Sequence, residues 1–222
     1  MKHIVAIGTV ILLGAAIGLP RYACAGSESS NSKPVHQGFY FNADVGLGGS
    51  HYNITGPRDN LDVSGAAANV DFRFGYALTR HLVLSLDLNG TATVKNPDTR
   101  LNGSKLYYSN DTQYGTAMIG VGLTWYFDNN LFLGGTIGTA QLSVHQNNTD
   151  INSDNGFGAQ VRFGKEWWVG DDWGLGVVGG LSYASANANS NLTVNSPSGS
   201  YTAYFDHAEA TTAFIAFTAT FN

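Results

Sequence analysis

The chain has 222 residues, of which 12% are charged and 12% are aromatic, with 28 glycines and a formal net charge of −5. Its single cysteine, Cys24, excludes an intramolecular disulfide. The acidic balance, without a basic cluster, argues against a nucleic-acid-binding protein. Few charges combined with many aromatic residues and glycines are unusual for a soluble enzyme and favour β-structure with an apolar exterior.

Residues 1–25 have the features of a secretory signal peptide. Lys2 gives a basic start, an apolar run covers residues 4–19, and the sequence ACAG at 23–26 fits an A-x-A cleavage site. The apolar run is too short for a retained transmembrane helix. Two of the 11 Lys and Arg residues leave with the signal, so nine face 16 Asp and Glu in the mature chain.

A lipoprotein signal anchored through Cys24 is the alternative for this N-terminus. That motif has a small residue and a leucine just before the cysteine, where Arg21 and Tyr22 stand here. We therefore favour cleavage after Ala25. Residues 26–36 then form a short, polar, mobile periplasmic linker.

From residue 37 to residue 222, apolar side chains alternate with small or polar ones, and a period of two predicts β-strands. Leu142 and Val144 break the alternation of their segment, which predicts a bulge at residues 139–141. Lys165 falls on an apolar face, where it either extends toward the membrane surface or marks a second bulge. The eight predicted strands cover residues 38–49, 69–78, 81–90, 115–127, 130–144, 156–169, 173–184 and 213–222.

The connections between these segments alternate between short and long. The short ones lie at residues 79–81, 128–130 and 170–172, and the long polar ones at residues 52–66, 91–114, 145–155 and 185–207. An even number of strands with short turns on one rim and long loops on the other is typical of outer-membrane barrels. The sequence predicts an all-β, eight-stranded antiparallel up-and-down transmembrane β-barrel, with its turns and both termini in the periplasm.

All four tryptophans stand beside a predicted short turn. They are Trp125, Trp167, Trp168 and Trp173. In a lipid-facing barrel this placement predicts an aromatic girdle at the periplasmic interface. Large aromatic residues also flank turns in soluble β-proteins, but the uniformly apolar outward faces favour the girdle.

The inward faces of the predicted strands carry six charged residues. They are Asp44, Asp71, Arg73, Asp87, Arg162 and Glu166. An eight-stranded barrel is only just wide enough for its own side chains, and unpaired charges inside it would be costly. We expect the two arginines to pair with the carboxylates and close the lumen. The surplus of acids implies a trapped water or one protonated carboxyl.

The segment "GYALTRHLVLSLDLNG" and the aromatic final strand resemble the small outer-membrane β-barrel family that includes OmpX and the barrel domain of OmpA. The resemblance is one of pattern over the whole mature chain. It implies a monomer in contact with membrane lipid and lipopolysaccharide, with Phe217 and Phe221 as a C-terminal signal for the outer-membrane assembly machinery. Asn222 departs from the family, whose members usually end on an aromatic residue.

Three motifs suggest chemistry, and each also has a simpler explanation. Gly174, Gly176 and Gly179 match GxGxxG, but no helix follows them. The segment 150–156 resembles the start of a calcium loop, yet Val161 stands where the bidentate glutamate belongs. Neither a cofactor nor a metal is expected.

Rim histidines raise the third possibility, a lipid A-modifying enzyme. Ser143 and His145 share a face, and Asp206 and His207 lie in another loop. The sequence favours instead a non-enzymatic barrel whose surface loops serve structural or interaction roles. A second alternative is a small barrel that binds or passes apolar ligands, similar to OmpW.

Overall fold

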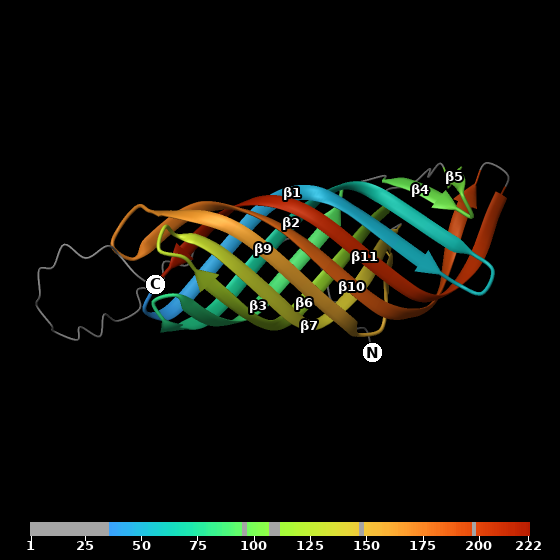
Figure 1. Cartoon of the computed structure of the whole chain (residues 1–222). Helices are drawn as coiled ribbons and strands as arrows, with labels where there is room; N and C mark the ends of the chain where they lie inside the picture. Colours follow the sequence, from blue (N-terminus) through green and yellow to red (C-terminus); the bar gives the residue numbers. More distant parts are fainter. Residues whose placement is uncertain (1–35, 95–96, 107–111, 147–148, 197–198) are drawn as a thin grey trace, which may run out of the picture. The chain divides into compact units, whose positions relative to one another are not determined.

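A computed structural model describes residues 36–94, 97–106, 112–146, 149–196 and 199–222 (Figure 1). Residues 1–25, expected to be a signal peptide, and residues 26–35 of the expected linker lie outside these residues. No helix in the described part of the chain is long and apolar enough to cross a membrane. Every regular element described is a β-strand.

Eight long strands close into an antiparallel barrel. In spatial order β1, β11, β10, β9, β7, β6, β3 and β2 are neighbours, and β1 also pairs with β2. The short strands β4 (Asp98–Leu101) and β5 (Ser104–Leu106) add to β2, and β8 (Thr149–Asn152) adds to β7. The barrel strands are β1 (Gly38–Thr55), β2 (Asn60–Thr79), β3 (Leu82–Thr93), β6 (Thr112–Tyr126), β7 (Leu131–Gln146), β9 (Gly156–Trp168), β10 (Trp173–Ser196) and β11 (Gly199–Phe221).

Alternation decides which side chains enter the barrel. On β3, Leu84, Leu86 and Leu88 are exposed on the outer wall, while Ser85 and Asp87 are buried inside. The same parity holds on the other strands, so the outer wall is a band of exposed Leu, Val, Ile and Phe side chains. The eight-stranded barrel predicted from the sequence is confirmed.

One end of the barrel, here called the turn rim, carries the short connections at residues 80–81, 127–130 and 169–172. Asn130 closes its turn with a φ of 58°, a left-handed conformation that asparagine tolerates better than most residues. His81 contacts the carbonyl oxygen of Tyr126 through Nδ1 at 2.9 Å. The opposite end, called the hairpin rim, carries the longer strand extensions.

The long polar connections predicted from the sequence are mostly strand. β1 and β2 stay paired to Thr55 and Asn60, and β10 and β11 stay paired from Ser196 and Gly199 onward. The prediction was wrong because Ser, Thr and Asn indicate turns only statistically. Beyond the apolar band the sense of the alternation changes, because the inward side chains, such as Tyr52 and Leu61, are apolar and buried while the outward ones, such as Asn53, are polar. The backbone pairing continues through this change.

The bulge predicted at residues 139–141 is also absent. The register of β7 runs without a break against β6, and Leu142 is buried in the lumen with Val144 packed beside its cluster. These two residues therefore break the alternation because the lumen itself becomes apolar. The pairing of Lys165 is likewise regular, and its Nζ lies 5.8 Å from the centre of the Trp167 ring.

The lumen has two contrasting parts. The part nearer the hairpin rim is apolar, and the part nearer the turn rim holds the buried charges. The apolar lumen cluster comprises Tyr52, Ile54, Leu61, Val63, Tyr114, Met118, Ala140, Leu142, Ala184, Ala186, Ala188, Phe205, Ala208 and Ala210.

Candidate functional site: a charged network across the lumen

Arg73 lies at the centre of the buried charges. Its Nη1 is 2.6 Å from Asp44 Oδ2, its Nη2 is 3.1 Å from Asp71 Oδ2, and its Nε is 3.5 Å from Asp87 Oδ2. Asp44 and Asp71 are direct cross-strand neighbours on β1 and β2, and Asp87 is the cross-strand neighbour of Arg73 on β3. Carboxylates placed directly opposite each other repel, so the guanidinium between them offsets that repulsion.

Arg162 reaches the same carboxylate from the opposite wall of the barrel. Its Nη1 lies 3.4 Å from Asp44 Oδ2, and its Nη2 donates to Thr124 Oγ1 at 3.0 Å. Its guanidinium stands 5.1 Å from the centre of the Phe132 ring. Gly134 leaves the necessary room, since a Cβ there would lie only 2.8 Å from Arg162 Nε. The ion pairs thus connect β1 to β9 across the lumen.

Neutral side chains complete this network. Gln160 Oε1 accepts from Arg73 Nη2 at 3.0 Å, Asn89 donates to Asp71, and Thr136 donates to Asp87. Buried charges require such hydrogen bonds to be tolerated. The lumen at this level is therefore filled by side chains from β1, β2, β3, β7 and β9.

Glu166 is placed apart from the two arginines. It accepts hydrogen bonds from Tyr126 Oη at 3.0 Å and Thr220 Oγ1 at 2.8 Å, and Tyr40 Oη lies 3.0 Å from Tyr126 Oη. No ion pair to Glu166 within 4.0 Å is found in the described chain. This carboxyl therefore belongs to a tyrosine cluster near the turn rim.

His36 closes the turn rim, although the sequence places it in a mobile linker. It is buried, its ring centre lies 3.6 Å from that of Tyr126, and its Nδ1 is 2.7 Å from Asn222 Nδ2. Burial lowers the pKa of His36 to about 4, against a smaller opposing effect of the Asn222 hydrogen bond. No local sequence pattern indicates this contact, because it joins the first and last described residues.

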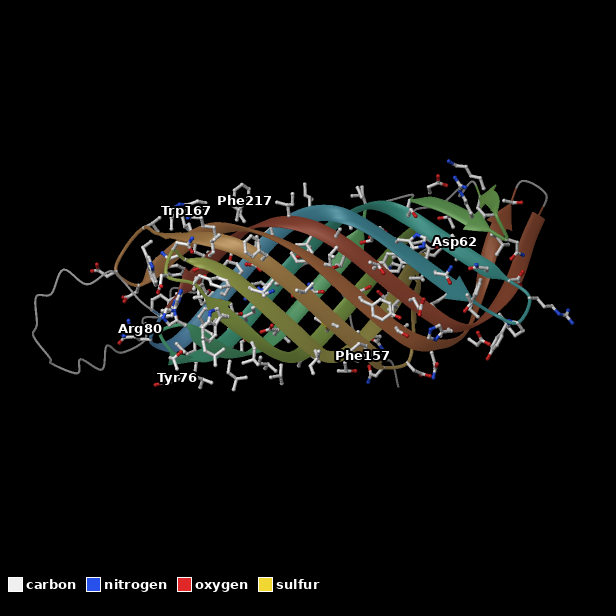
Figure 2. All side chains as sticks on the ribbon, in the orientation of Figure 1. Asp62, Tyr76, Arg80, Phe157, Trp167 and Phe217 are labelled. Carbon is white, nitrogen blue, oxygen red and sulfur yellow. The ribbon has the colours of Figure 1, made fainter. Side chains whose placement is uncertain are left out.

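Three of the four tryptophans face outward at the turn rim. Trp125, Trp167 and Trp173 are about half exposed, and Figure 2 shows Trp167 near the end that also holds Tyr76 and Arg80. Trp168 differs from the predicted girdle because its parity places it on the inner side. Its ring centre is 5.2 Å from that of His36. Trp168 therefore packs against His36, which closes the lumen at the turn rim.

The terminal aromatic residues lie on the outer face of β11. Phe217 is 79% exposed, and Phe221 pairs with Phe41 on β1 and packs against Trp173 with ring centres 5.3 Å apart. Asn222 lies beyond the strand, where its backbone N donates to the carbonyl oxygen of Asp172 at 3.1 Å. The last residue thus continues the hydrogen bonding of the turn rim.

The GxGxxG match and the calcium-loop-like segment lie in or between strands of the barrel. Gly174, Gly176 and Gly179 lie inside β10 rather than in a phosphate-binding loop. The segment 150–156 runs from β8 into β9, and no group of three metal-binding side chains is found among the described residues.

The histidines near the hairpin rim do not form a relay with a serine. His145 Nδ1 lies 2.6 Å from Asp150 Oδ1, but Ser143 makes no hydrogen bond with His145 in the described chain. His207 Nε2 is 3.4 Å from Ser185 Oγ and 3.5 Å from Glu209 Oε1. Both neighbours approach the same nitrogen, whereas a catalytic relay needs the acid on the other nitrogen.

A closed antiparallel barrel with an apolar outer wall, buried charges and a rim of outward aromatic residues defines a transmembrane β-barrel of the bacterial outer-membrane type. The solved structure of Neisserial surface protein A has this fold. It is 16% identical, with a TM-score of 0.51, over 83% of this chain and 97% of that one.

Two further solved structures are similar at lower scores. Ail of Yersinia pestis is 10% identical, with a TM-score of 0.43, over 83% of this chain and 99% of that one. OprG of Pseudomonas aeruginosa is 13% identical, with a TM-score of 0.43, over 85% and 98%. No protein-family model and no curated protein matches the sequence.

Proposed function

We propose that the chain is a non-enzymatic integral protein of the outer membrane with a closed lumen, which presents β-hairpins at the cell surface for structural or interaction roles. The observation that carries this proposal is the combination of a side-chain-filled lumen with hairpins that continue beyond the apolar band. In outer-membrane barrels the short turns face the periplasm. The hairpin rim is therefore the extracellular end.

The surface role is supported by the change of side-chain type along β1 and β2. Leu47 is exposed within the apolar band, whereas the outward residues from the His51–Ser64 pair to the end of the hairpin are polar. Asn53 Nδ2 donates to Asp62 Oδ1 at 2.8 Å across the hairpin, and Figure 2 shows Asp62 toward the hairpin rim. Extended polar hairpins offer a partner both side chains and backbone groups.

The environment follows from the outer wall. Its exposed apolar band suits membrane lipid, and the extracellular rim adjoins lipopolysaccharide. We also assign Phe217 and Phe221 to recognition by the outer-membrane assembly machinery, as expected for the resemblance. The wall aromatics Trp125, Trp167 and Trp173 act as the girdle at the periplasmic interface.

The location is tested by cell fractionation and gel mobility. We expect the protein in the outer-membrane fraction, with unboiled samples migrating differently from boiled ones in SDS. A closed barrel has no free strand edge for detergent to unravel, so it stays folded until heated. Recovery in the soluble periplasmic fraction would contradict the proposal.

The closed lumen predicts that the wild-type protein is silent in planar bilayers. An eight-stranded barrel has room only for its own side chains, and the pairs of Arg73 and Arg162 with Asp44 cross that space. Ions would have to displace these buried pairs to pass. A porin purified in the same detergent serves as the positive control, and large stable current steps from this protein would contradict the closed lumen.

A second candidate function is the binding of an apolar ligand within the barrel. It is supported by the apolar character of the lumen near the hairpin rim, where Tyr52, Leu61 and Phe205 face inward. Saturable binding of a labelled hydrocarbon to the purified barrel would favour this function. Unchanged lipid A masses in cells with and without the protein would separate both candidates from a lipid A-modifying enzyme.

A further inference from the structure

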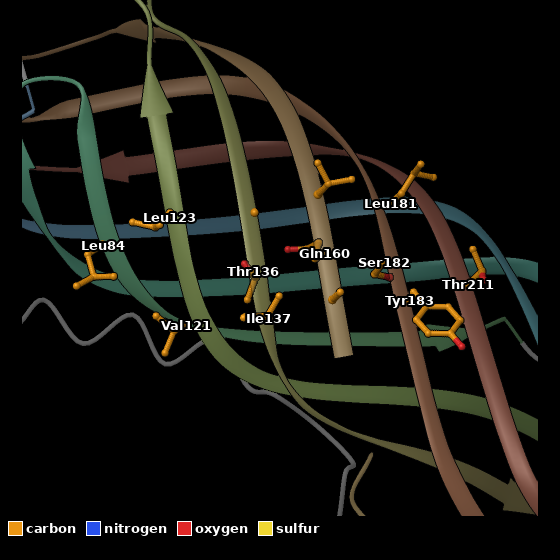
Figure 3. Close-up of a pocket in the computed structure, with 13 residues that line it drawn as sticks. Leu84, Val121, Leu123, Thr136, Ile137, Gln160, Leu181, Ser182, Tyr183 and Thr211 are labelled. Atoms are coloured by element: carbon orange, nitrogen blue, oxygen red, sulfur yellow. The ribbon is translucent and has the colours of Figure 1, made fainter. Parts of the chain in front are cut away.

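A groove of about 690 Å³ crosses the outer wall over β7, β9 and β10 (Figure 3). Two adjacent rows of cross-strand partners form it. One row runs from Leu84 through Gly135 to Leu181, and the other runs from Val121 through Ala159 to Thr211. Each row crosses four gaps between strands, which at about 4.8 Å per gap gives a length of about 19 Å.

The groove is hollow because small residues stand where the wall otherwise carries large ones. Gly135 and Ala159 occupy its floor, between exposed Ile137, Val161 and Leu181. A Cβ added at Gly135 would lie 3.9 Å from the nearest backbone oxygen, an ordinary contact distance. A larger side chain would therefore fit there and would fill the groove without straining the barrel.

The polarity of the row through Ala159 changes along its length. It begins with Val121 and Ile137, and its cross-strand pairing continues beyond Thr211 to His51 and Ser64. His51 Nδ1 lies 2.9 Å from Ser64 Oγ on the outer surface. This row is thus apolar at one end and polar at the other, as a lipid molecule is.

Tyr183 marks the boundary between the two ends. Its ring lines the groove, and its hydroxyl donates to Glu209 Oε1 at 2.8 Å. Amphipathic aromatic residues favour the membrane–water interface in this way. The apolar end therefore lies in the hydrocarbon region, and the polar end lies at the extracellular headgroups.

We propose that this groove binds one acyl chain of an outer-leaflet glycolipid, with the sugar headgroup against the end formed by Thr211, His51 and Ser64. Hydroxyl, imidazole and carboxylate groups exchange hydrogen bonds with sugar hydroxyls. The register continues from Ser64 to Asp98 on β4, and Asp98 pairs with Lys105 at 3.4 Å and with Arg100 at 3.8 Å, so this end also holds cations that suit a phosphate on the sugar. The inference rests on the proposed location in the outer membrane.

The test uses a photoreactive phenylalanine analogue at Ile137 in the groove, compared with the same probe at Leu47. Leu47 is exposed on β1 and does not line the groove. In vesicles of phospholipid with a small fraction of lipid A, the Ile137 probe is expected to form lipid A adducts about tenfold above the bulk fraction. The Leu47 probe is expected to follow the bulk composition.

Filling the groove should abolish this enrichment. We expect the loss in Gly135→Leu and, independently, in Ala159→Leu, with heat-shifted gel mobility confirming that each variant is folded. Gly90→Leu is the matched control, because Gly90 on β3 also faces outward, with the nearest atom 3.9 Å from an added Cβ, but neither lines the groove nor lies on its two rows. It should leave the lipid A adduct unchanged.

The other outcomes overturn the proposal in distinguishable ways. Adducts in bulk proportion at both positions would show an ordinary lipid-facing wall. A crosslinked dimer at Ile137 would assign the groove to a second copy of the chain. If neither probe labelled any lipid, the barrel would not be in the bilayer, and the proposed function would fail with the groove.

Discussion

Replacing Arg73 with methionine is expected to lower the free energy of unfolding by about 3–5 kcal/mol, the scale for leaving buried charges without their partner. Arg73 contacts three buried carboxylates, those of Asp44, Asp71 and Asp87. Among the described residues, the only other cation within 4 Å of these carboxylates is Arg162, at 3.4 Å from Asp44. Methionine preserves much of the side-chain volume, so the loss reports the charge rather than a cavity.

The measurement is guanidinium-induced unfolding of the refolded barrel in lipid vesicles. Arg73→Lys should lose less stability, because an ammonium restores the charge but not the five donors of the guanidinium. Arg162→Met should also lose less, because Arg162 faces one carboxylate within 4 Å rather than three. Arg80→Met, in an exposed turn, is the control and should change stability by less than about 0.5 kcal/mol. A loss for Arg73→Met as small as that of Arg80→Met would contradict the network.

Acidification from pH 7 to pH 4 is expected to destabilise the wild-type protein by up to about 3 kcal/mol more than it destabilises His36→Phe. Burial lowers the pKa of His36 from 6.5 to about 4. Between these values the unfolded chain takes up a proton that the folded protein does not. The stability contributed by neutral His36 is therefore complete above pH 6.5 and is lost as the pH falls toward 4.

The quantity to measure is the difference in unfolding free energy between wild type and His36→Phe at each pH, because all other titratable groups are the same in the two proteins. Phenylalanine keeps an aromatic ring beside Tyr126 and Trp168. His36→Leu, a second replacement that cannot be protonated, is the control and should lose the same part of the pH dependence as His36→Phe. Equal pH profiles for wild type and His36→Phe would show that protonation of His36 does not destabilise the folded protein.

The barrel itself could be predicted from the sequence because lipid and lumen impose opposite requirements on adjacent residues. A one-residue shift of β3 would expose Asp87 to lipid and bury Leu86, so its parity is fixed by the pattern. The alternation of β2 and β3 likewise predicts Arg73 and Asp87 on the inner face. Where the lumen becomes apolar, as at Leu142, an apolar side chain no longer identifies the lipid side. The bulge predicted at residues 139–141 was wrong for this reason.

The ion pairs between non-adjacent strands could be identified only from the closed barrel. Arg162 and Asp44 are distant in sequence and on non-adjacent strands, and only the curvature of the wall brings them together. No pattern in the sequence indicates that Glu166 contacts Tyr126 and Thr220 instead of an arginine. His36 was missed for a related reason, since a single histidine in a polar segment carries no periodic signal.

Closure between β1 and β11 also determines when this protein can become a barrel. Phe41 pairs with Phe221, so the free edge of β1 gains its backbone hydrogen bonds only when β11, the last strand, pairs with it. Contacts between such distant residues form slowly because loop-closure entropy opposes them. Until then both edges expose unpaired backbone groups that favour aggregation. The two edge strands therefore need protection from aggregation until they pair with each other, and a chain truncated before β11 could not close the barrel.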